Sequence, residues 1–275
     1  RMVFQERRAL LSFVTYVLLM ASYYLIRPTR STIFLEEWGA QYMPIFYLLI
    51  AAFTLGATFF YNYLVSRFPR AVLIRLVFLA VIVSFLFFWT LYSGTLGYSK
   101  QVTIAWYIWI CVYILFLTSL FWSFNHDLYT PEESKLLYPL ILLGAQIGVI
   151  LGAKMVEILV KKMGIGTYNL IGVSALMLLG VLFCLEGLHF CAPHKNERRY
   201  ADAQRTGSLR YLGNMARSPY ALSIAAIVVL GTFSFTICDL QYKRLLEKSK
   251  IGRASCRGKS VDVGGRRNLK KKNTN

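Results

Sequence analysis

The sequence predicts an all-α protein that crosses a membrane several times, and three observations support this fold class. Apolar residues make up 56% of the 275 residues, whereas charged residues make up 16%. Several uninterrupted apolar stretches reach about 20 residues, the length that a helix needs to span a bilayer. Most basic residues outside the C-terminal tail lie between these stretches, where they set the orientation of membrane proteins. We therefore expect a polytopic membrane protein.

Seven spans are expected in chain order. They lie at about residues 9–26, 44–65, 71–92, 103–124, 136–160, 168–190 and 219–240. The segment RPTR at residues 27–30 is expected to close the first span, and an amphipathic connector with Glu36, Glu37 and Trp38 leads to the second. Proline opens the second span at Pro44 and the seventh at Pro219.

The fifth span carries a capping signal ahead of its apolar run. Thr130 can accept a hydrogen bond from a free amide of the first turn, Pro131 suits the first helical position, and Glu133 can reach back to the amide of Thr130. The sequence therefore predicts a helix that starts in water at Pro131 and enters lipid near Leu136.

Glycines recur every four residues along this fifth span. Gly144, Gly148 and Gly152 leave one helix face bare, so we expect another span of the bundle, not lipid, to approach that face to backbone contact. Four polar residues are expected at or near the same seam, which predicts a polar interior: Asn125, His126, Asp127 and Gln146.

Charge and span order divide the chain. The distribution of Lys and Arg among the loops favours a cytoplasmic N-terminus. Residues 1–190 are expected to form a six-helix bundle, 191–218 a basic cytoplasmic linker, and 219–250 the first helix of a truncated second bundle. This order favours a six-plus-six transporter. The turn at residues 62–70 also keeps two arginines of the loop that major facilitator proteins carry between their second and third helices.

Residues 251–275 are expected to be foreign to the protein. Their start, IGRASCR, resembles the translation of a common sequencing adapter, and the resemblance continues to about Arg267. The alternative is a disordered basic tail. Its eight Lys/Arg and one Asp supply +7 of the formal net charge of +18. No nucleic-acid partner is therefore inferred from the total charge.

Four charged residues at span ends are candidates for solute binding. Arg27 and Arg30 share a helix face if the helix continues through Pro28, and their guanidinium groups match phosphate oxygens. Alternatively, they reach toward lipid headgroups. Asp239 and Lys243 end the seventh span at i, i+4, either as a site or as a simple ion pair.

Other polar residues suggest local roles. Arg75 is expected to extend toward the membrane surface, Lys154 and Glu157 to pair, and His126 to cap a loop in preference to relaying protons. No phosphate-binding glycine loop, nucleophile elbow or metal triad is found. We therefore expect no catalytic residue, metal site or cofactor, and no enzyme.

Three groups of residues resemble one family. YLIRPTRS at residues 24–31 resembles the Y-x-x-L-R-x-x-K-D signature of the ATP/ADP translocases of plastids and intracellular bacteria. FWSFN at 121–125, with EESK at 132–135 and YP at 138–139, is similar to their F-W-G-F-A-N, E-A-K and Y-P-L. DLQYK at 239–243 looks like their E-V-x-W-K. Together the motifs cover residues 9–249 in the family's order.

The resemblance implies a major-facilitator-like bundle that exchanges nucleotides, commonly ATP for ADP and phosphate. Arg30 stands at the family's substrate lysine and Asp239 at its seventh-helix acid. Together with Arg27, Asn125 and Lys243 they form the expected substrate-binding set. Two departures favour some phosphorylated or anionic solute over strict ATP/ADP exchange: Ser31 replaces an acid, and Ile110 replaces the fourth-helix glutamate.

The expected location is the bacterial inner membrane, with a nucleotide or other anionic small molecule and membrane lipid as partners of a monomer. Two alternatives stay open. One is a divergent major-facilitator carrier for another anion or a drug-like solute. The other is a non-transporting membrane scaffold or sensor, which has no need of Arg30 and Asp239 facing a central cavity.

Overall fold

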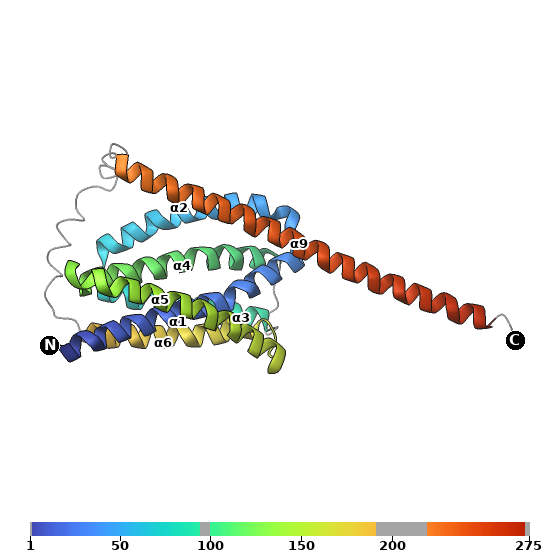
Figure 1. The fold of residues 1–275 in the computed structure, drawn as a ribbon, viewed down its shortest axis with the longest axis horizontal. Coiled ribbons are helices and arrows are strands. Elements are labelled where there is room, and N and C mark those ends of the chain that lie inside the picture. The colour runs from blue at the N-terminus through green and yellow to red at the C-terminus, as the bar shows by residue number, and fades with distance from the viewer. Residues whose placement is uncertain (1, 94–99, 191–218, 273–275) are drawn as a thin grey trace. The chain divides into compact units, whose positions relative to one another are not determined.

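The computed structural model describes residues 2–93, 100–190 and 219–272, and all regular structure in these ranges is helical (Figure 1). Seven helices in these ranges are long and apolar enough to cross a membrane. These findings agree with the predicted class of helical multi-pass membrane protein. The predicted linker at residues 191–218 lies outside the described residues.

The chain divides into two compact units, one made of Arg1–Glu37 and Leu48–Arg205, the other of Trp38–Tyr47 and Thr206–Asn275. The first contains α1 (Met2–Glu37), α3 (Arg70–Tyr92), α4 (Lys100–Leu128), α5 (Pro131–Glu157), the π-helical turn η2 (Ile158–Lys162) and α6 (Asn169–Phe190). The second contains η1 (Ala40–Tyr42) and α9 (Pro219–Lys272). Helix α2 (Met43–Arg67) begins in the second unit and continues in the first from Leu48.

Helix α1 does not end at Pro28, contrary to the sequence prediction. It continues to Glu37 with Pro28 inside it and exposed. The following turns still bury one face, because Ile33 and Phe34 are 2% and 0% exposed. Phe34 packs on the ring of Tyr107 at 4.6 Å between centroids. This packing outweighs the hydrogen bond that proline removes.

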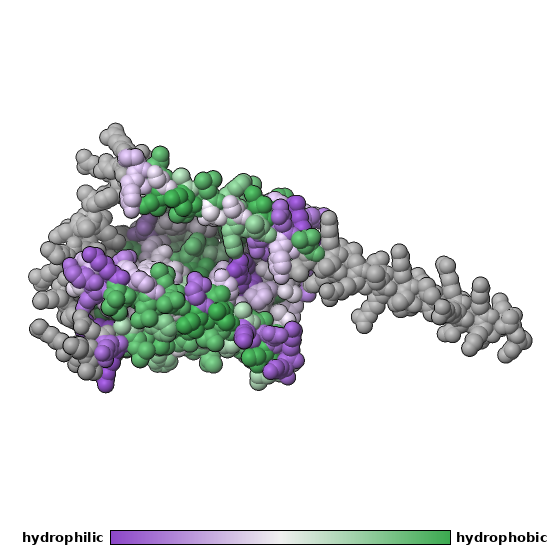
Figure 2. Space-filling model, in the orientation of Figure 1, coloured by the Kyte–Doolittle hydropathy of each residue, from purple (hydrophilic) through white to green (hydrophobic). Residues whose placement is uncertain are grey.

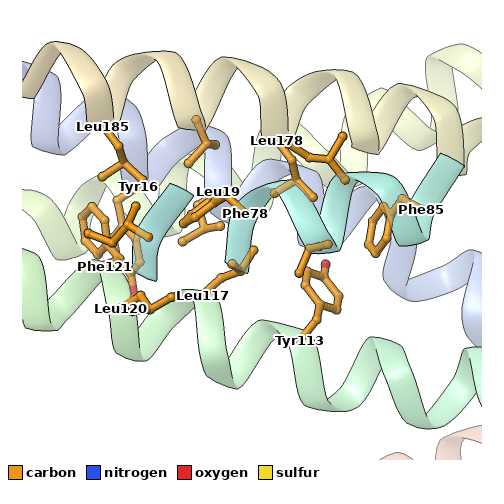
Figure 3. Packing of buried hydrophobic residues seen from close by; sticks show 14 of the residues in the cluster. Tyr16, Leu19, Phe78, Phe85, Tyr113, Leu117, Leu120, Phe121, Leu178 and Leu185 are labelled. Atoms are coloured by element: carbon orange, nitrogen blue, oxygen red, sulfur yellow. The ribbon is translucent and has the colours of Figure 1, made fainter. Parts of the chain in front are cut away.

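The core of the first unit lies where α1, α3, α4 and α6 meet (Figure 3). Tyr16 of α1 stacks on Phe121 of α4, with ring centroids 4.6 Å apart and nearly parallel planes. Phe78 of α3 and Leu178 of α6 are fully buried farther along the core, and Phe85 of α3 is fully buried near Tyr113, with ring centroids 5.1 Å apart. Large apolar side chains at these positions give the bundle its packing.

Glycines hold α5 against α1, as the sequence predicts. A Cβ added at Gly144 would lie 2.9 Å from Cδ2 of Phe13, and one at Gly152 would lie 2.5 Å from the carbonyl oxygen of Ala21. A Cβ at Gly148 would collide with the carbonyl oxygen of Val17. In each pair the α5 residue is numbered about 131 above its α1 partner, so the two helices run parallel in constant register.

The seam excludes two of the four polar residues expected there. Gln146 is exposed, because two residues from Gly144 is about half a turn around the helix. His126 is also exposed, and its Nδ1 lies 2.8 Å from the Tyr138 hydroxyl. Asn125 is fully buried in α4, so its predicted place in the interior is confirmed.

Two local ion pairs were not anticipated from the sequence. The Arg75 guanidinium makes a bidentate ion pair with Glu186, which joins α3 to α6, and the expected reach of Arg75 to the membrane surface stays a prediction. Glu157 bonds to Lys161, four residues later, at 3.0 Å. The expected Lys154–Glu157 pair is present as a charge interaction, whereas the contact within hydrogen-bond distance is made by the i+4 lysine.

Hydropathy along the first unit fits a membrane-spanning bundle. Hydrophobic residues cover the middle of the face built by α1, α5 and α6, and hydrophilic residues gather toward both ends (Figure 2).

The capping box that begins α5 is present in full, with the Thr130 N–H donating to Glu133 Oε2 at 3.0 Å and the Glu133 N–H donating to Thr130 Oγ1. The predicted start of α5 at Pro131 is thereby confirmed.

In the second unit, α9 begins at Pro219 as predicted but continues to Lys272, well beyond the expected end of the span near residue 240. The most hydrophobic window of its apolar part, Pro219–Leu245, contains no buried residue. Gly231 has open space where a Cβ would lie. Side chains from residue 246 on are not described, so the expectation that the tail makes no packed contacts falls outside the described residues.

Candidate functional site

Arg30 is a buried cation within an apolar helix. It lies on the inward face of α1 and is 7% exposed. Its Nη1 donates a hydrogen bond to Sγ of Cys111 at 3.0 Å, and its Cζ lies 4.8 Å from the ring centroid of Tyr107. Tyr107 and Cys111 are one turn apart on α4, so this helix presents a polarisable ring and a thiol to the guanidinium.

Arg27 lies near the same end of α1 and is partly exposed. Its Nη1 donates to the Tyr24 hydroxyl at 3.3 Å, and its Cζ is 5.4 Å from the ring centroid of the same tyrosine. Because α1 continues through Pro28, the condition for Arg27 and Arg30 to stand one turn apart on one helix is met. The two arginines therefore bring two guanidinium groups to one end of the helix.

Tyrosines surround this pair of arginines. Tyr23 makes edge contacts with Tyr24 at 5.4 Å and with Tyr113 of α4 at 6.4 Å between centroids. Tyr113 is fully buried, and its hydroxyl has no hydrogen-bond partner among the described residues. We call Tyr23, Tyr24, Arg27, Arg30, Tyr107, Cys111 and Tyr113 the arginine cluster. It combines fixed positive charge with aromatic surface.

A second charged cluster belongs to the second unit. Lys243 Nζ lies 2.6 Å from Asp239 Oδ2 on α9, one helical turn away. The Tyr47 hydroxyl donates to the same carboxylate oxygen at 2.8 Å and accepts from Lys243 Nζ at 3.3 Å. The Lys243 side chain is 5% exposed and that of Asp239 is 22% exposed. Both candidate residues therefore form an ion pair that the Tyr47 hydroxyl bridges.

Asn125, the fifth candidate residue, does not join the arginine cluster. It lies 14 residues beyond Cys111 on α4, which corresponds to about 21 Å along a helix. Its Nδ2 donates to the Phe121 carbonyl at 2.8 Å, and its Oδ1 has no partner among the described residues. The structure thus places Asn125 at the opposite end of α4 from the residues that contact Arg30.

The end of α4 near Asn125 is tied to the start of α1. Ser12 Oγ and the Tyr129 hydroxyl are 2.8 Å apart, and both residues are buried. Burial raises the pKa of the Tyr129 phenol above its ordinary value, and the hydrogen bond with Ser12 opposes that shift. Tyr129 therefore stays neutral at physiological pH and joins the two helices as a structural contact.

Three contact residues were missed by the sequence analysis: Tyr47, Tyr107 and Cys111. Tyr47 is 192 residues from Asp239 in the chain, and Cys111 is 81 residues from Arg30. Tyr107 lies three residues before Ile110 and Cys111 lies one residue after it, and Ile110 is the position at which the family has its glutamate. Their i, i+4 spacing on either side of that position was the available signal.

The fold and its charged clusters define a class, a helical multi-pass membrane protein with buried cations inside its apolar helices. Comparisons with protein-family models, curated proteins and solved structures found no match to this chain. The resemblance to ATP/ADP translocases therefore rests on the motifs at residues 24–31, 121–139 and 239–243.

Proposed function

We propose that this protein is a secondary transporter of the ATP/ADP translocase type, which exchanges nucleotides or a related phosphorylated anion across the bacterial inner membrane. In this proposal the fold is major-facilitator-like and the N-terminus is cytoplasmic. The observation that carries the proposal is the burial of Arg30 inside an apolar span, one turn beyond Arg27.

A buried arginine in a membrane helix is a mark of function. Arginine keeps its charge at all physiological pH values, and placing it inside an apolar span costs several kcal/mol, by rough estimates of membrane insertion. Such a charge is retained where it binds a solute or an internal partner. Two guanidinium groups one turn apart suit the oxygens of a phosphate chain, which accept pairs of parallel hydrogen bonds.

The surroundings of Arg30 favour a phosphorylated anion in general over strict ATP/ADP exchange. Ile110, at the position of the family's fourth-helix glutamate, is fully buried in the apolar core. Ser31, at the position of a first-helix acid, donates its hydroxyl to the Arg27 carbonyl at 3.3 Å. Tyr107 and Cys111 therefore replace carboxylate chemistry on the α4 side of Arg30.

In this proposal the Asp239–Lys243 pair is a second candidate element for anion binding, within its own unit. Asp239 stands at the family's seventh-helix acid, and Lys243 neutralises it at 2.6 Å. An anionic solute that reaches Lys243 competes with Asp239 for the ammonium group. The pair therefore supplies a cation that is released only when the anion arrives.

The test is equilibrium binding to the purified chain in lipid nanodiscs, with radiolabelled ATP, ADP and inorganic phosphate as separate probes. Arg30→Ala should abolish binding, and Arg30→Lys should retain part of it, because lysine keeps the charge but loses the planar fork. Arg7→Ala is the matched control, since Arg7 is an arginine of the same helix but is exposed.

Uptake of labelled nucleotide into bacterial cells that express the gene gives the second readout. Arg30→Ala should eliminate uptake, whereas Arg7→Ala should leave it unchanged. Normal binding and uptake by Arg30→Ala would mean that Arg30 is only an anchor, and the nucleotide proposal would fail. Binding of phosphate without ATP or ADP would favour a carrier for another anion, and binding of none of the probes would favour a scaffold or sensor.

A further inference from the structure

Tyr113 of α4 carries a buried hydroxyl that its protein surroundings leave unsatisfied. The residue is 0% exposed, and its hydroxyl has no hydrogen-bond partner among the described residues. Figure 3 shows the hydroxyl directed from α4 into the interior of the bundle. The ring makes edge contacts with Phe85 of α3 at 5.1 Å and with Tyr23 of α1 at 6.4 Å between centroids. Packing therefore fixes the position of the phenol, while its polar group still needs a partner.

Packing alone does not explain a tyrosine at this position. A buried hydroxyl without a hydrogen bond is unfavourable, and phenylalanine would fill the same space without that cost. Buried polar groups in folded proteins are almost always paired. The Tyr113 hydroxyl therefore points to a hydrogen-bond partner that the described residues do not supply.

The phenol of Tyr113 interacts electrostatically with the arginine cluster. The groups that act on it include the charge of Arg30, the Tyr23 hydroxyl and the Cys111 thiol. Arg30 in turn donates to Cys111 Sγ at 3.0 Å. Tyr23 and Cys111 are both partly exposed, so the buried hydroxyl lies behind groups that can be reached from the surface. An anion that binds to Arg30 is therefore brought toward a neutral O–H donor.

Two neighbours of the cluster have the same feature. Thr29, which precedes Arg30, is 1% exposed, and Trp106, which precedes Tyr107, is fully buried. Neither Thr29 Oγ1 nor Trp106 Nε1 has a hydrogen-bond partner among the described residues. Each of these groups can donate a hydrogen bond, as the Tyr113 hydroxyl can. Unsatisfied donors therefore occur beside the residues that hold the buried cation, an arrangement that suits an oxyanion.

We infer that the Tyr113 hydroxyl is a further solute-binding group, which donates a hydrogen bond to a phosphoryl oxygen of the anion that Arg30 binds. The inference rests on the proposed function, because it takes a phosphorylated anion as the solute. The terminal oxygens of an ionised phosphoryl group are acceptors, and a hydrogen bond to a charged acceptor is stronger than one to a neutral acceptor. Arg30 supplies the positive charge, and Tyr113 fixes the orientation of one oxygen. The anion reaches the hydroxyl when Tyr23 and Cys111 move apart, a step that belongs to the transport cycle.

The test compares Tyr113→Phe with the wild-type chain in lipid nanodiscs, with radiolabelled ATP and inorganic phosphate as separate probes. The variant keeps the ring and loses only the hydroxyl. We expect it to weaken the binding of both probes by about ten- to a hundredfold, as the loss of one hydrogen bond to a charged acceptor would produce. Without a probe, titration with a denaturing detergent should show equal or higher stability than in the wild type, because an unsatisfied buried hydroxyl has been removed.

Tyr129→Phe is the matched control. Tyr129 is also buried, but its hydroxyl lies 2.8 Å from Ser12 Oγ. Loss of this hydroxyl should lower the stability of the chain and leave the binding of both probes unchanged. A purely structural hydroxyl at position 113 would give the same pattern as Tyr129→Phe.

Wild-type affinity for both probes in Tyr113→Phe, together with loss of binding in Arg30→Ala, would overturn the inference and leave the proposed function intact. A loss for ATP without a loss for phosphate would overturn it as well, because the hydroxyl would then contact the nucleoside. A clear loss of stability in Tyr113→Phe without a probe would show that the hydroxyl already has a partner in the chain. If the wild-type chain binds neither probe, the proposed function fails, and with it the inference.

Discussion

Arg30 and Lys243 are both buried cations on apolar helices, but each is held by different chemistry within its own unit. Lys243 contacts a carboxylate at 2.6 Å and a phenol at 3.3 Å. Arg30 contacts a thiol at 3.0 Å and the face of a tyrosine ring at 4.8 Å. The contacts described for Lys243 include a formal opposite charge, and those described for Arg30 include a thiol and a ring face.

The difference shows two solutions to the cost of a cation in an apolar environment. An ion pair fixes its members tightly, and removal of one member leaves a charge that is expensive to bury. A ring face and a thiol each contribute about 1 kcal/mol or less and tolerate some movement of the guanidinium. We therefore expect substitutions near Lys243 to affect stability most, and those near Arg30 to affect solute binding most.

The largest expected effect on stability is that of Asp239→Leu. It leaves the Lys243 ammonium without its carboxylate, and we expect a loss of about 3 kcal/mol in the free energy of unfolding. Titration with a denaturing detergent, followed by tryptophan fluorescence, measures this loss. The double variant Asp239→Leu with Lys243→Leu should regain most of the stability, because both charges are then absent. Equal losses in the two variants would show that the ion pair contributes little.

Gly148→Leu should affect the arginine cluster but not the Asp239–Lys243 pair. The leucine would push α5 away from α1, which carries the arginine cluster, at a cost of roughly 1–3 kcal/mol. Nucleotide binding should weaken, while the accessibility of Cys238 on α9 to a maleimide reagent should not change. Gly187→Leu on α6 is the control, because a Cβ there meets no atom within 4 Å. A stable Gly148→Leu protein with normal binding would contradict the inference that Gly148 holds α5 against α1.

Tyr47→Phe should have a moderate effect. It removes one hydroxyl that donates to Asp239 and accepts from Lys243, and a single hydrogen-bonding group of this kind contributes about 1 kcal/mol. The detergent titration should show this loss in the wild-type background but not in Asp239→Leu/Lys243→Leu, where these two partners of the hydroxyl are absent. The same loss in both backgrounds would assign the effect to packing alone.

The smallest effect is expected at Cys111. Cys111→Ser keeps an acceptor near Arg30 Nη1, so stability should change by about 0.5 kcal/mol or less, whereas Cys111→Ala removes the acceptor and should cost about 1 kcal/mol. Nucleotide affinity should follow the same order. A large loss of stability in both variants would show that the thiol packs more tightly than its hydrogen bond with Arg30 implies.

The sequence predicts well those features that depend on neighbours along the chain. Thr130, Pro131 and Glu133 form their capping box within one turn, so the start of α5 could be placed to the residue. The glycines at 144, 148 and 152 share a helix face by their spacing alone. The same spacing argument, applied to Gln146, would have placed it on the exposed side.

Features that depend on distant packing could not be predicted. The continuation of α1 through Pro28 is stabilised by the packing of Phe34 on Tyr107 of α4. Arg75 pairs with Glu186, which lies 111 residues away in the chain. The partners of Arg30 and Asp239 come from α4 and from the start of α2. The sequence identified the charged residues of both clusters, but not the neutral groups that hold them.

The constant register between α1 and α5 has a consequence for insertions and deletions. One residue added within α5 before Gly144 would rotate all three glycines by about 100° around the helix axis, away from α1. An insertion at the junction of residues 128–130 would shift α5 without breaking its four-residue spacing. Insertions and deletions should therefore be tolerated between these helices and should disrupt the bundle when they fall inside them. The segment from Thr130 to Gly152 is the one whose length this fold keeps fixed.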